Sequence, residues 1–105
     1  MDELLKLIKA MDLPFAYDHF AEGESIDPPF ICYFLPGSNH FSADGKAYFK
    51  ANMVNIELYT DHKDLSVERK VEAALDERGI FYDRSEVWIE SEKLYEVLYS
   101  FEMEA

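Results

Sequence analysis

The chain is poor in the residues and segments that several classes of protein require. It has one cysteine, Cys32, so an internal disulfide is excluded and a reducing compartment is compatible with it. No stretch approaches the roughly 20 consecutive apolar residues that span a bilayer. The start, Met1-Asp2-Glu3, lacks the positive segment of a secretory signal. We therefore expect a protein made in the cytoplasm, with no membrane partner.

Basic residues are also scarce. Ten lysines and arginines face 22 acidic residues, which gives a formal net charge of −12. Phosphate backbones and anionic membrane surfaces carry the same sign as this chain, so they repel it. The composition therefore argues against direct binding to nucleic acid.

Residues that carry catalysis or bind metals are few and scattered. His19, His40 and His62 lie in three separate segments, without the paired spacing of a metal site. Cys32 lies within an apolar strand pattern, where a thiol is normally an inert core residue. Because 22 of the 105 residues are acidic, close pairs such as Glu90 and Glu92 arise by chance. We predict no enzyme, no cofactor and no metal.

The second half of the chain has clear periodic patterns. Residues Val54–Thr60 alternate apolar and polar side chains, which predicts a half-buried strand. Asp64–Arg78 carries apolar residues at helical spacing, with Asp64 or Ser66 as the N-cap and Gly79 in the left-handed stop position. A strand hairpin follows over Val87–Phe101.

Placing apolar residues of both strands on the same side predicts the register of this hairpin. A three-residue turn, Ser91-Glu92-Lys93, places Ile89 opposite Tyr95 and Val87 opposite Val97. A two-residue turn would place Glu96 opposite Val87 and mix the two faces. The preferred register leaves Trp88, Leu94 and Leu98 together on the side away from the aromatic row.

The first half predicts shorter elements. We expect a helix over Asp2–Met11, an edge strand at Phe15–Tyr17, a strand covered on both faces at Phe30–Leu35, a connection over Pro36–Asp44, a turn at Asp44-Gly45 and a strand over Ala47–Lys50. The whole predicts one domain, residues 1–105, of α+β class. Its sheet is mainly antiparallel, has four to six strands and carries two helices on one face.

Aromatic residues make up 15% of the chain, more than a core of this size encloses, because each large ring buries roughly 150–250 Å². Some therefore reach the surface, where tyrosine and tryptophan favour protein interfaces. The alternative is that the tyrosine rings belong to the edges of the core and only their hydroxyls reach water. The candidate residues for an oligomer interface are Tyr59, Trp88, Leu94, Leu98, Phe41 and Asp44.

Four segments, taken in order, resemble the tail completion proteins of long-tailed bacteriophages, also called head-tail joining or tail terminator proteins. They are Pro28–Tyr33 (PPFICY), Ala43–Tyr48 (ADGKAY), Val54–Asp64 (VNIELYTDHKD) and Val87–Glu102 (VWIESEKLYEVLYSFE). The resemblance implies a virion structural protein, made in the bacterial host cytoplasm, that forms a hexameric ring at the head-proximal end of the tail. Its partners would be other copies of itself, the tail tube protein and the head connector protein, with DNA passing through without specific binding. The family offers no catalytic residue to transfer.

Two other interpretations stay open. The net charge of −12 also suits an acidic protein that mimics DNA and occupies a basic nucleic-acid-binding partner. Its acids, however, are spread along the chain and its aromatics are numerous for a solvated mimic. A small enzyme would require a pocket with convergent polar groups, and no motif in the sequence indicates one.

Overall fold

The computed structural model describes residues 2–19, 26–38, 41–43, 46–49 and 51–104. The elements run in the order α1 (Asp2–Ala10), β1 (Phe15–Tyr17), β2 (Phe30–Ser38), β3 (Phe41–Ala43), β4 (Lys46–Phe49), β5 (Ala51–Thr60), α2 (Leu65–Glu77), β6 (Tyr82–Ile89) and β7 (Leu94–Glu104). The molecule is elongated, with extents of 50 × 30 × 24 Å.

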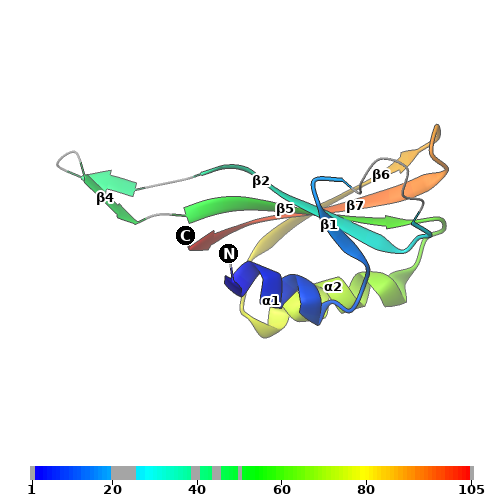
Figure 1. The fold of residues 1–105 in the computed structure, drawn as a ribbon, viewed down its shortest axis with the longest axis horizontal. Coiled ribbons are helices and arrows are strands. Elements are labelled where there is room, and N and C mark those ends of the chain that lie inside the picture. The colour runs from blue at the N-terminus through cyan, green and yellow to red at the C-terminus, as the bar shows by residue number, and fades with distance from the viewer. Residues whose placement is uncertain (1, 20–25, 39–40, 44–45, 50, 105) are drawn as a thin grey trace.

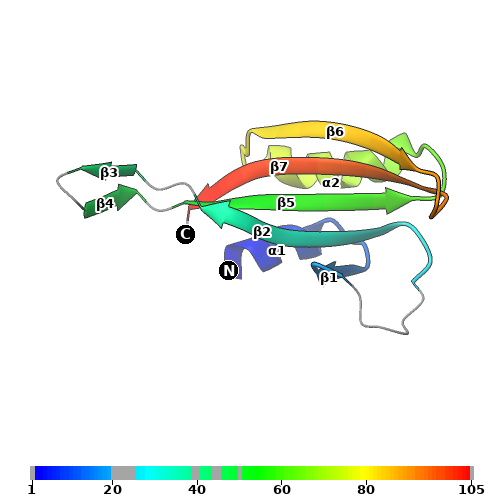
Figure 2. The same cartoon turned by 90° about the horizontal axis from the view of Figure 1, so that it is seen from above.

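Five strands form the main sheet in the order β1-β2-β5-β7-β6. All neighbours in it pair antiparallel except β1 and β2, which pair parallel through three residues each. Both helices lie against one face of this sheet (Figure 1), and the opposite face is seen in front of them in Figure 2. The predicted α+β class, with a mainly antiparallel sheet and two helices on one face, is confirmed.

The core lies between the sheet and the two helices. On β5, Val54, Ile56 and Leu58 are buried on the helix side, while the alternate residues are partly exposed on the other. From α1, Leu7 and Ile8 are fully buried, and burying a side chain of this size contributes about 1.5–3 kcal/mol. The alternation predicted for Val54–Thr60 is confirmed because one face of the strand is covered.

The ends of α2 follow from local chemistry. Asp64 is the N-cap, and its side chain accepts hydrogen bonds from the backbone N–H groups of Ser66 and Val67. Gly79 has a φ of 65°, the left-handed conformation that glycine adopts without strain. Of the two N-cap candidates, the structure therefore selects Asp64, and the predicted stop at Gly79 is confirmed.

A network of charged residues joins α2 to β6. The Glu68 side chain on α2 is buried, with its carboxylate 2.7 Å from Lys63 Nζ and also paired with Arg84 on β6. Glu86, also on β6, lies 3.0 Å from Arg84 Nη2. Buried charge is tolerated only where it is paired, so this network fixes which residues of β6 face the helix.

That placement shows that the predicted register of the hairpin was wrong. Ile89 pairs with Leu94, Trp88 with Tyr95 and Val87 with Glu96. This is a shift of one residue, which moves every side chain of β6 to the other face. The prediction assumed that the apolar residues of β6 face the core, whereas its helix-facing positions include polar residues that pair with α2.

The segment between β2 and β5 also differs from the prediction. Pro36–Ser38 continues β2 past an irregularity between Phe34 and Gly37, so it is not part of a connection. Strands β3 and β4 pair only with each other, as a separate two-stranded sheet. This hairpin extends beyond the end of the main sheet (Figures 1 and 2). The predicted turn at Asp44-Gly45 lies outside the described residues.

Candidate interaction surfaces

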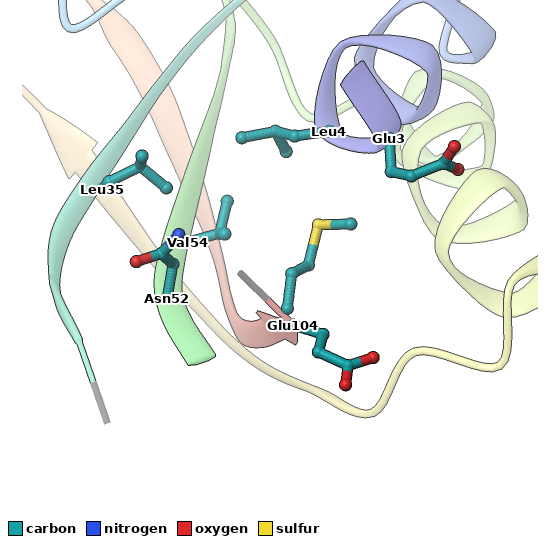
Figure 3. A pocket seen from close by; sticks show the side chains of 7 residues that line it. Glu3, Leu4, Leu35, Asn52, Val54 and Glu104 are labelled. Carbon is teal, nitrogen blue, oxygen red and sulfur yellow. The ribbon is translucent and has the colours of Figure 1, made fainter. Parts of the chain in front are cut away.

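The cavity between α1 and the sheet is too small for a substrate site. A cavity of about 30 Å³ lies between α1 and the sheet, lined by Leu4, Leu35 and Val54 among others. Figure 3 shows Glu3 and Glu104 at its rim. Small-molecule sites usually enclose about 300–1,000 Å³, so this cavity holds little more than a water molecule.

The described residues also contain no group of three or more His, Cys, Asp or Glu side chains placed to hold a metal ion. His19 and His62 are exposed and lie beside Asp18 and Asp61, at 3.1 Å and 2.7 Å respectively, and His40 lies outside the described residues. Burial, then the nearby carboxylates, Glu57 foremost, raise the pKa of Cys32 to about 11. Within the described part, no helix has the length and apolar character to cross a membrane.

The sheet face away from the helices brings together three of the predicted interface residues. Tyr59 on β5 and Leu94 and Leu98 on β7 all lie on this face and are only partly buried. Phe30 stacks on Tyr59, with ring centroids 5.1 Å apart. We call this surface, over β2, β5, β7 and β6, the open face (Figure 2). It is partly apolar and no described helix covers it.

Two glutamates sit within this apolar surface. The Tyr59 hydroxyl donates to Glu57 Oε1 at 3.0 Å and lies 3.4 Å from Glu96 Oε2. Burial raises the pKa of Glu57 above its ordinary value of 4.5, and the carboxylate of Glu96 adds to the shift, although the Tyr59 hydrogen bond opposes it. Burial and a second carboxylate nearby thus both disfavour the charged form of Glu57.

The other predicted interface residues lie elsewhere. Trp88 is on the helix side of the sheet, where its ring packs against Tyr95 at 4.7 Å and its Nε1 donates to Glu90 at 2.6 Å. It was predicted to share a face with Leu94 and Leu98, and the shifted register overturns that placement. Phe41 begins β3 in the projecting hairpin, and Asp44 lies outside the described residues.

Sequence reasoning missed one prominent residue, Phe81. Its side chain is 91% exposed, in the short link between α2 and β6. It borders a shallow, open hollow of about 440 Å³ that Met53, Ile80 and Asp83 also line. In the sequence, an aromatic residue directly before a strand is indistinguishable from the first core residue of that strand, so no pattern would have identified it.

The outer edge of β6 is a further exposed feature. This strand ends the sheet order, and six of its eight residues, Asp83–Trp88, are exposed. An edge strand presents backbone N–H and C=O groups to which another chain can add. Charged residues on the same strand, Arg84 and Glu86, limit indiscriminate pairing.

Comparison with solved structures finds a similar fold in a chain of a virion. A chain of the structure described as the virion of a native gene transfer agent particle superposes with a TM-score of 0.64 and 12% sequence identity. The alignment covers 93% of this chain and 82% of that one. No protein family matches the chain. No curated protein matches it in sequence either.

Proposed function

We propose that this protein is a bacteriophage or prophage virion structural protein. It forms a ring, a hexamer, at the head-proximal end of the tail, where it terminates the tail tube and joins the tail to the head connector. It acts by fitting against copies of itself and against other virion parts, and no bond is made or broken.

The observation that carries this proposal is the fold shared with a chain of a gene transfer agent virion, over 93% of this chain. The surfaces of the molecule support it. The open face and the edge of β6 offer partly apolar area and free strand backbone, which suit contact with another protein.

Ring closure requires two different patches on each subunit. In a heterologous contact, one patch of a subunit meets a different patch of its neighbour, and the chain of contacts closes when the rotation per subunit divides a full turn. The net charge of −12 also suits a channel for DNA, because acidic residues facing the bore would repel phosphates over a Debye length of about 8–10 Å. DNA would then pass through the channel without binding to its wall.

Addition to isolated tail tubes tests the proposal. Tubes assembled without this protein, from a phage that encodes it, would be incubated with the purified chain and imaged by electron microscopy. We expect one end of each tube to acquire a ring and to become competent to join heads. Tubes that stay bare at every concentration of the chain would refute the assignment to the tail.

The DNA-mimic alternative is less well supported by the side chains. A mimic presents its carboxylates to solvent, whereas Glu68 is 4% exposed and Glu57 and Glu72 each accept a hydrogen bond from a tyrosine. Competition with DNA for a basic partner, abolished by moderate salt, would favour the mimic.

A further inference from the structure

In the part of the chain that the structure describes, the projecting hairpin of β3 and β4 pairs with no strand of the main sheet. Strands β3 and β4 have three and four residues and pair with each other alone. An isolated two-stranded hairpin of this length is marginally stable in water. Its extension beyond the sheet, seen in both Figure 1 and Figure 2, leaves it placed to contact another molecule.

The composition of the hairpin differs from that of the chain. Residues 41–50 read FSADGKAYFK, with three aromatic residues, two lysines and one aspartate. A segment of net charge +1 thus stands out from a chain of net charge −12. The hairpin would therefore bind best to a surface that has apolar area and unpaired carboxylates.

The hollow beside Phe81 has that character. Met53, Ile80 and Phe81 supply apolar lining, and the exposed Asp83 supplies a carboxylate. Asp83 is paired with Ser100 in the β6–β7 ladder, and within the described part of the chain its side chain forms no hydrogen bond or ion pair. Phe81, at 91% exposure, gives the hollow a large aromatic side chain of a type that is enriched in the cores of protein interfaces.

We propose that the β3–β4 hairpin of one copy docks into the hollow beside Phe81 of the next copy, with Lys46 near Asp83. This inference rests on the proposed ring. The hairpin leaves the sheet from β2 and β5, and the hollow lies at the same end of the sheet, over the first residues of β5, the last residues of β7 and the start of β6 (Figure 2). The hairpin and the hollow are two different patches of each subunit, so a contact between them is heterologous, which closed rings need.

A charge-reversal series tests the contact, with sedimentation velocity over a concentration series as the measurement. Lys46→Glu and Asp83→Lys, made singly, should each raise the concentration at half-assembly by about tenfold, because attraction becomes repulsion at every contact in the ring. The double variant restores an attractive pair with the charges exchanged, so its concentration at half-assembly should return most of the way to the wild-type value. Lys93→Glu is the matched control: it makes the same change in the β6–β7 turn, at the opposite end of the sheet, and should leave assembly unchanged.

The outcomes separate this inference from the proposed function. Assembly of the wild type that neither single variant weakens would overturn the docking contact and leave the ring standing. Weakened single variants without recovery in the double variant would overturn the pairing of Lys46 with Asp83. A wild type that stays monomeric would overturn both. Far-UV circular dichroism and unfolding midpoints of each variant verify that it folds.

Phe81→Ser supplies an independent variant. The side chain is almost fully exposed, so the substitution should leave the unfolding midpoint within error of the wild type. Assembly should nevertheless weaken about tenfold or more, because the contact would bury the apolar ring of Phe81 and the substitution removes it. Unchanged assembly of Phe81→Ser would place the hairpin elsewhere and refute the hollow as its receptor.

Discussion

Replacing Arg84 by methionine should destabilise the folded chain through Glu68. Arg84 is the cation that reaches Glu68 from β6, and it also lies 3.7 Å from Glu72 and 3.0 Å from Glu86. Removing one partner of a buried ion pair costs about 3–5 kcal/mol. Lys63 remains 2.7 Å from Glu68, and the Arg84 side chain is 34% exposed, so we expect the lower figure of about 2–3 kcal/mol.

Urea unfolding followed by fluorescence of Trp88, which is the one tryptophan of the chain, measures this loss. Lys93→Met is the control, because it also removes a cation from a glutamate, Glu90, but both side chains are at least 70% exposed. The control should cost less than about 0.5 kcal/mol. Adding Glu68→Leu to Arg84→Met should cost less than the sum of the two single changes. An Arg84→Met variant as stable as Lys93→Met would refute the view that this network holds β6 to α2.

Three further predictions concern local interactions. Asp64→Ala should lower the free energy of unfolding by about 1 kcal/mol, whereas Ser66→Ala, two residues further along, should change it by a few tenths of a kcal/mol at most; equal losses would contradict the N-cap assignment. Cys32 should react with an aromatic disulfide reagent at pH 8 only as fast as the chain unfolds, because its thiol is buried and its pKa is raised to about 11; rapid labelling of the native protein would contradict this. The fold raises the pKa of Glu57, so the protonated side chain stabilises the folded chain below pH 4.5, and this contribution is lost as the pH rises through the raised pKa. Glu57→Gln should therefore become more stable than the wild type as the pH rises from 4.5 to 7. The pKa of Glu86 is lowered, first by its hydrogen bond with Lys63, so Glu86→Gln should instead lose stability over the same range; urea titrations that show both variants shifting in one direction would contradict the two assignments.

The sequence predicted elements whose signals are local. The strand Val54–Thr60 and the two ends of α2 were placed correctly, because alternation, an N-cap side chain and a left-handed glycine act within a few residues. The register of β6 could not be placed in this way. Its helix-facing side carries Arg84, which is stabilised there by Glu68 on α2, and a pattern of apolar residues does not report such a pairing.

The interaction surfaces were only partly predictable. Leu94 and Leu98 were predicted to share one side of β7 and they do, because alternation along a strand fixes the side of each residue, whereas Trp88, predicted beside them, lies on the helix side. Their contact with another molecule stays a prediction. The projecting hairpin was taken for a connection followed by a strand of the main sheet, since the pattern of short strands does not tell which strand each will pair with. Phe81 was missed because exposure depends on tertiary packing.

Particle mass in solution tests the central claim most directly. Sedimentation velocity or light scattering over a wide range of concentration should show the 12.3 kDa chain giving way to one closed species of fixed mass, a whole multiple of the subunit, that stops growing at higher concentration. A chain that remains a monomer at every concentration would contradict the account, as would open-ended growth without a preferred size.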